Sequence, residues 1–162
     1  FLTKTSSKTL PLMYRMNKDS VMFSSKSNEW ETPQQLFDTL NAEFSFTIDV
    51  AATSDNAKCQ RYYTKADDAL SKDWRGETVF MNPPYGREIG SWVSKDWTEM
   101  QKHNITEVMI IHARKDTSYF QDYCLKGEVR YLRGRLKFSN AKHGAPFPSA
   151  VVVFRRLEGY SD

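Results

Sequence analysis

Apolar residues from position 30 onward alternate between helical spacing and short continuous runs, whereas residues 1–28 show no sustained period. Apolar positions three or four residues apart predict helices over residues 33–44, 89–100 and 119–125. Short apolar or alternating runs predict strands at residues 44–50, 60–64, 78–81, 107–111, 129–132, 135–138 and 150–154. Alternating helices and strands favour an α/β fold, and the last three runs predict a terminal β-meander.

The first helix has a start signal of its own. Thr32 precedes Pro33, and threonine is a favoured N-cap while proline is favoured at the first helical position. The segment before it, residues 1–28, is rich in Ser, Thr and Lys and is expected to be a mobile tail. Because the chain begins with Phe, Met16 is the expected native start and residues 1–15 a non-native extension. Residues 29–162 are expected to form a single domain.

The segment Asn82-Pro83-Pro84-Tyr85 directly follows the apolar run 79–81. A residue before proline is pushed out of the helical region, so this loop presents Asn82 in an extended backbone. The Asn82 amide oxygen and the Pro83 carbonyl could each accept one hydrogen of a planar exocyclic amine, while Tyr85 stacks on the base that carries it. A turn that merely ends a strand is the alternative, but the complete tetrapeptide is far rarer than Asn-Pro alone.

Charge is distributed unevenly along a chain whose net charge is only +3. No acidic residue lies between Glu128 and Glu158, a stretch that contains seven Lys and Arg residues. This pattern favours contact with a polyanion, although a solvated basic surface is the alternative. The candidates for DNA binding are Arg133, Arg135 and Lys137, followed by Arg87 and Lys95 beside the Asn82 loop.

Composition excludes several classes of protein. The longest strongly apolar run, residues 150–154, is too short to cross a bilayer. Two cysteines, Cys59 and Cys124, are too few for a disulfide framework and fit a reducing cytosol. The histidines show no Cys or carboxylate partner at metal-ligand spacing, so no metal site is predicted from His103, His112 and His143.

Several blocks in fixed order carry a family resemblance over roughly residues 16–156. They are Met22-Phe23-Ser24-Ser25, Trp30-Glu31-Thr32-Pro33, Asp49-Val50-Ala51-Ala52, Asp67-Asp68, Met81-Asn82-Pro83-Pro84-Tyr85-Gly86 and Arg133-Gly134-Arg135-Leu136-Lys137-Phe138. With these blocks the chain resembles the phage-type DNA N6-adenine methyltransferases.

The resemblance implies a class I methyltransferase (Rossmann-like) fold, S-adenosyl-L-methionine as methyl donor and adenine in double-stranded DNA as acceptor. It further implies a protein of the bacterial cytoplasm with no metal, no membrane and no obligate protein partner. The donor pocket would be lined by Trp30, Thr32, Pro33, Asp49, Ala51 and Ala52, with Asp67 or Asp68 facing the adenosine. The catalytic loop would hold the flipped base with Asn82, Pro83, Pro84 and Tyr85.

Two departures bear on the predicted fold and site. Ala51 and Ala52 stand where the wider superfamily has glycines, so the backbone approaches the donor less closely there. Only 32 residues separate Asp49 from Asn82, too few for two full crossover helices, which predicts a trimmed sheet. Two other functions remain open: a protein glutamine N5-methyltransferase, which uses the same loop on a planar amide, and a non-catalytic nucleic-acid-binding module.

Overall fold

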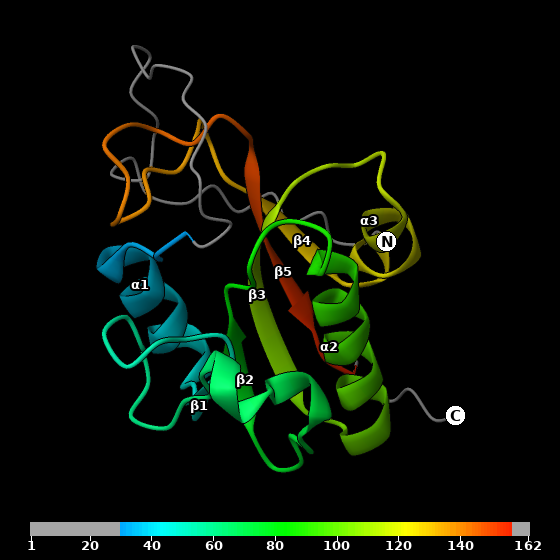
Figure 1. Cartoon of the computed structure of the whole chain (residues 1–162). Coiled ribbons are helices and arrows are strands. Elements are labelled where there is room, and N and C mark those ends of the chain that lie inside the picture. Colours follow the sequence, from blue (N-terminus) through cyan, green and yellow to red (C-terminus); the bar gives the residue numbers. More distant parts are fainter. Residues whose placement is uncertain (1–29, 157–162) are drawn as a thin grey trace.

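A five-stranded mixed sheet forms the centre of the protein in this computed structural model, which describes residues 30–156 (Figure 1). The strand order is β1-β2-β3-β5-β4. β1, β2 and β3 are parallel, β5 is antiparallel to β3, and β4 is antiparallel to β5. The strands are β1 (Ile48–Asp49), β2 (Thr78–Met81), β3 (Thr106–His112), β4 (Glu128–Tyr131) and β5 (Ser149–Phe154). The predicted α/β class with a mixed sheet is confirmed.

Helices cover both faces of this sheet, with α1 on one side and α2 and α3 on the other (Figure 1). They are α1 (Gln34–Phe44), α2 (Ile89–His103) and α3 (Ser118–Asp122), and 3₁₀ turns lie at Lys65–Asp67, Ala69–Ser71 and Cys124–Lys126. None of the helices within residues 30–156 has the length and apolar character that a membrane span requires. The predicted tail, the Met16 start and the Met22–Ser25 block lie outside the described residues.

Helical spacing explains which side of each helix is buried. On α1, Leu36, Phe37 and Leu40 face the sheet, and the Phe37 ring meets Phe80 of β2 edge-on at 5.0 Å between centroids. On the opposite face, Trp97 of α2 meets Phe154 of β5 edge-on at 5.2 Å. Edge-to-face contacts of this kind add to the free energy gained by burying the rings.

Three predicted strand assignments were wrong. The run 44–50 is a strand only at Ile48–Asp49, because α1 continues to Phe44 and Ser45 then adopts a left-handed conformation with φ 57°. The run 60–64 forms a single bridge, Asp49 to Tyr62. The run 135–138 has alternating burial, with Leu136 and Phe138 inside, but it forms no strand. The terminal meander is therefore a pair of antiparallel strands, β4 and β5, joined by a long irregular segment, residues 132–148.

The predicted trimming of the sheet is confirmed between β1 and β2. That connection contains two 3₁₀ turns and no α-helix among residues 50–77. The helix start, in contrast, differs from the prediction. Pro33 takes the N-cap position without a side-chain cap, so the Thr32 hydroxyl does not cap α1.

Two groups of ionisable side chains lie buried in the fold. Arg130 of β4 is 3% exposed and donates two hydrogen bonds of 2.7 Å to the Glu43 carboxylate of α1 and one of 2.5 Å to Glu128. Asp96 of α2 and Glu107 of β3 are both fully buried. Burial raises the pKa of Asp96 to about 8, and burial together with the Asp96 charge raises the pKa of Glu107. At neutral pH this carboxyl pair therefore retains protons.

Candidate active site

β1 and β2 are adjacent and parallel, so the loops that follow them meet at the same edge of the sheet. A cavity of about 810 Å³ opens between these loops. Most of the predicted site residues line it: Trp30, Thr32, Asp49, Ala51, Ala52, Asp68, Asn82 and Pro84. Of the residues predicted for the donor pocket and the catalytic loop, four are absent from its lining: Pro33, Asp67, Pro83 and Tyr85.

The Asn82 side chain is held in one orientation. Its Nδ2 donates to the Trp30 carbonyl oxygen and, at 2.9 Å, to the Thr32 hydroxyl. A carbonyl can only accept, so the amide nitrogen must face Trp30. The Asn82 oxygen Oδ1 is buried and has no hydrogen-bond partner among residues 30–156. A buried acceptor left unpaired at a cavity wall suits a ligand that donates a hydrogen bond.

The segment that holds Asn82 is itself anchored by the irregular segment 132–148. The Ser139 backbone nitrogen donates to the Glu31 carbonyl at 2.8 Å, and the Ser139 hydroxyl donates to the Thr32 carbonyl at 3.2 Å. The Glu31 nitrogen donates to Asn140 Oδ1 at 2.9 Å. The Trp30 ring packs against Phe138 and Phe147 at 5.3 and 5.2 Å between centroids. Segment 132–148 thus supports the wall of the cavity that residues 30–32 and Asn82 line.

Tyr85, the last residue of the catalytic loop, turns its side chain into the protein core. Its side chain is buried, its hydroxyl donates to the Ile110 carbonyl of β3 at 3.1 Å, and burial raises its pKa well above the ordinary range. Its ring contacts Phe147 and His112 at 5.4 and 5.8 Å between centroids. In this conformation the ring supports the loop, and its stacking on a base stays a prediction. His112 is half-buried.

Asp49 shapes the loop that follows β1. Its carboxylate accepts hydrogen bonds from the backbone nitrogens of Ala51 at 3.2 Å and Lys58 at 3.0 Å. Burial raises the pKa of Asp49, and these two hydrogen bonds act in the opposite direction. These hydrogen bonds hold the loop of residues 50–58 in place beside the cavity, although positions 51 and 52 are alanines and not glycines.

The structure distinguishes the two candidate aspartates. Asp67 accepts hydrogen bonds from the Thr64 nitrogen at 2.8 Å and the Thr64 hydroxyl at 3.0 Å, and both lower its pKa. Asp67 therefore closes a capping box at the start of a 3₁₀ turn. Asp68, the next residue, adopts φ 54° and lines the cavity.

Trp92 of α2 is a cavity residue that the predicted site does not contain. Its side chain is half-buried, packs against the core and lines the cavity. Its indole nitrogen has no hydrogen-bond partner among residues 30–156. Among the residues that line the cavity, the Trp92 indole nitrogen is thus an unpaired buried donor and Asn82 Oδ1 an unpaired buried acceptor.

The predicted DNA-binding residues separate into two groups. Lys95 donates to the Lys72 carbonyl at 2.5 Å and pairs with Glu99 at 3.5 Å. Its ammonium group therefore already has partners within the protein. Arg87 is exposed and lines a second cleft, of about 660 Å³, between α2 and α3. On segment 132–148, Arg133 and Lys137 are exposed and Arg135 is half-buried.

Arg114 is a basic residue that the sequence did not single out. It follows β3 at the same edge of the sheet as the catalytic loop. Burial, together with the nearby charges of Arg114 and Arg135, lowers the pKa of His112 to about 4. Both arginines therefore lie close to His112, whose ring contacts Tyr85. Arg114 could have been identified from the sequence, because it comes shortly after the apolar run of a predicted strand, and functional residues often lie at the carboxyl ends of parallel strands.

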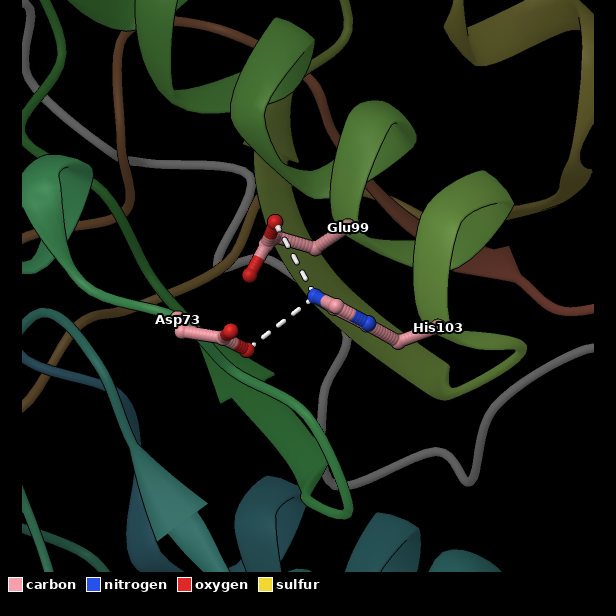
Figure 2. Close-up of side chains that lie close together, drawn as sticks. All are labelled: Asp73, Glu99 and His103. Atoms are coloured by element: carbon pink, nitrogen blue, oxygen red, sulfur yellow. Dashed lines mark ion pairs between the residues drawn. The ribbon is translucent and has the colours of Figure 1, made fainter.

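A separate polar cluster joins α2 to the loop before β2, as Figure 2 shows. His103 Nε2 lies 3.0 Å from Asp73 Oδ1 and 3.9 Å from Glu99 Oε2. The interpretation that His103 lacks a carboxylate partner at ligand spacing was therefore wrong, since Glu99 precedes it by four residues on α2. Lys95 and the Trp74 backbone nitrogen already contact the Glu99 carboxylate. We interpret the cluster as an ion-pair network, and the absence of a metal stays a prediction.

The trimmed mixed sheet with a cavity at its carboxyl edge is consistent with the class I methyltransferase-like proteins. The chain matches the DNA N-6-adenine-methyltransferase (Dam) family over residues 19–157 and belongs to that family. This finding confirms the predicted enzyme class, an adenine-specific DNA methyltransferase.

Similar proteins agree with this assignment. The DNA N-6-adenine-methyltransferase of Haemophilus phage HP1 is 30% identical over 155 residues, which cover 90% of this chain and 88% of that protein. The DNA N-6-adenine-methyltransferase of Escherichia phage T1 is 27% identical over 57% of this chain and 39% of that protein. An Escherichia coli K12 protein, YfdM, whose name assigns it provisionally to the methyltransferases, is 37% identical over 43% of this chain and 84% of that protein.

Proposed function

We propose that this chain transfers a methyl group from S-adenosyl-L-methionine to the N6 amino group of an adenine that has been rotated out of double-stranded DNA. The observation that carries the proposal is the buried, unpaired Oδ1 of Asn82 in the cavity wall, next to an amide nitrogen that is fully engaged. An acceptor fixed in this way is complementary to a group that donates a hydrogen bond, such as an amino group, and not to a carbonyl oxygen, which only accepts.

The chemistry assigned to the chain is hydrogen-bond acceptance and alignment. Asn82 Oδ1 and the Pro83 carbonyl would each accept one N6 hydrogen, which draws the nitrogen lone pair out of conjugation with the ring. Bound S-adenosyl-L-methionine supplies an electrophilic methyl group, so no covalent enzyme intermediate is needed. The nitrogen forms the new bond to carbon while the carbon–sulfur bond breaks, and the amine then loses one proton to solvent. Alignment of the reacting atoms accounts for much of the acceleration.

The residues of the cavity fit an adenosine-bearing sulfonium. A cavity of about 810 Å³ is within the size range of small-molecule sites. Asp68 places a carboxylate at its wall, where it can accept ribose hydroxyl hydrogens. Trp30, Ala51 and Ala52 supply apolar surface beside it. Asp68, and not Asp67, is therefore our candidate for the ribose contact.

DNA would approach the same edge of the sheet. We assign phosphate contacts to Arg133, Arg135 and Lys137, and to Arg87 and Arg114 on the loops beside the catalytic segment. Rotating a base out of the stack costs a few kcal/mol, which phosphate contacts can offset in part. A phage-type enzyme of this kind would act in the bacterial cytoplasm, where its DNA substrate is located.

The experiment that tests the proposal offers the protein two substrates. With a methyl-labelled donor, duplex DNA should acquire label that digestion releases as N6-methyl-2′-deoxyadenosine, whereas added translation-factor proteins should stay unlabelled. The glutamine N5-methyltransferase alternative requires the reverse pattern. Label on cytosine, or no donor-dependent label on either substrate, would reject the proposed reaction.

A further inference from the structure

The direction in which the Asn82 amide faces decides whether the loop can serve its substrate. The oxygen of the amide accepts hydrogen bonds, whereas its NH₂ group only donates. If the amide rotated by half a turn, its NH₂ group would face an incoming amino group, and two donors would meet. A site for an exocyclic amine therefore needs a device that prevents this rotation.

Two contacts from the segment before α1 meet this need. The Trp30 carbonyl and the Thr32 hydroxyl accept the two hydrogens of Asn82 Nδ2, the latter at 2.9 Å. Thr32 is 3% exposed, so no bulk water replaces its hydroxyl at this position. The same hydroxyl makes no cap hydrogen bond to α1, although it directly precedes the helix start at Pro33. The hydroxyl instead accepts a hydrogen bond from the Asn82 amide, which lies 50 residues away in the sequence.

We propose that Thr32 is a positioning residue for Asn82. Its hydroxyl holds the second hydrogen of the amide and keeps Oδ1 turned toward the substrate amine. This inference rests on the proposed function, and it adds a role for Thr32 beyond lining the donor pocket. The anchor is firm because Ser139 donates two hydrogen bonds to this segment, to the carbonyls of Glu31 and Thr32.

The test compares two substitutions at this position. Thr32→Val keeps the shape of the side chain and removes the hydroxyl, whereas Thr32→Ser keeps the hydroxyl. At saturating donor and DNA, Thr32→Val should lower kcat about tenfold, the scale of one lost hydrogen bond to a buried group. Thr32→Ser should restore kcat to within about threefold of the wild type. Donor Kd should change little in either variant, and Thr98→Val, an exposed change on α2, is the matched control.

A double variant separates positioning from direct binding. In an Asn82→Ala background, Thr32→Val should have almost no further effect on the residual rate, because the group that it orients is gone. If the two effects multiply, or if Thr32→Val weakens donor binding and leaves kcat unchanged, Thr32 acts on the donor and the inference is wrong.

A spectroscopic measurement keeps this test independent of activity. The side-chain NH₂ signals of Asn82, identified by their loss in Asn82→Ala, should shift and exchange faster with solvent in Thr32→Val than in the wild type or Thr32→Ser. Unchanged signals in Thr32→Val would refute the positioning role even if the protein methylates nothing. A wild-type protein with the expected signals but no DNA methylation would reject the proposed function alone.

Discussion

Asp96 illustrates how one buried carboxyl group links stability to pH. It lies fully buried next to Glu107, and burial raises its pKa to about 8. In the unfolded chain the pKa of an aspartate is about 3.9. Between these two values the native state holds more protons than the unfolded state, so the free energy of unfolding falls as pH rises. The pair therefore stabilises the protein least under alkaline conditions.

Asp96→Asn should weaken this pH dependence, because asparagine has nearly the same shape and does not ionise. Urea denaturation between about pH 5 and about pH 8 should show a smaller loss of unfolding free energy in the variant than in the wild type. Asp38→Asn, on the exposed side of α1, should leave the wild-type slope unchanged. Parallel slopes for Asp96→Asn and the wild type would show that this carboxyl does not titrate across that range.

At the residue scale, the sequence predicted which residues form the catalytic motif better than it predicted the hydrogen-bond and ion-pair partners of single side chains. The tetrapeptide at Asn82 was recognisable because its prolines fix the backbone. The hydroxyl of Thr32 was predicted to cap a helix, and only the tertiary structure directs it to Asn82. Asp67 and Asp68 are equivalent by sequence, and the capping box of Asp67 separates them. Lys95 has the right charge for DNA, but its position on α2 places it beside Glu99.

At the scale of elements, long periodic segments were predicted well and short ones were not. α2 and β3 follow from spacing and from continuous apolar character. The alternation at residues 135–138 also predicted a strand, and its burial alternates as expected. No strand forms there, because extended backbone can alternate in burial without a pairing strand, and Gly134 at φ 75° separates it from β4. Side-chain periodicity reports burial and not hydrogen-bond pairing.

Segment 132–148 carries the second prediction at this scale, because its basic residues would meet the DNA backbone. Arg135→Gln with Lys137→Gln should weaken DNA binding at every sequence and reduce the salt dependence by roughly two phosphate contacts. Donor affinity should not change. Arg75→Gln with Lys102→Gln removes the same charge at exposed positions near the amino ends of β2 and β3, and should leave the slope intact.

Other outcomes would assign a different role to these residues. A changed target sequence with an unchanged salt slope would mean that Arg135 and Lys137 read bases. An effect equal to that of the control pair would mean that segment 132–148 is only a solvated surface. Arg130 is unsuitable for such a test, since its pairing with Glu43 and Glu128 connects β4 to α1.

At the scale of the whole molecule, the site is assembled from three distant parts of the chain. Parallel strands bring the Asp49 and Asn82 loops to one edge, which the sequence pattern could predict. The contacts of Trp30 and Thr32 with Asn82, and of Thr32 with Ser139, span up to 107 positions and carry no local signal. The unpaired Asn82 oxygen is the result of this assembly, and it is the central feature of the proposed mechanism.

The most direct test of that mechanism is the methyl-transfer rate of Asn82→Ala in a single turnover, with donor and duplex DNA both saturating. Loss of the oriented acceptor should lower the rate by roughly two or more powers of ten, while donor Kd stays near the wild-type value. An Asn82→Ala protein that methylates adenine at close to the wild-type rate would contradict the account.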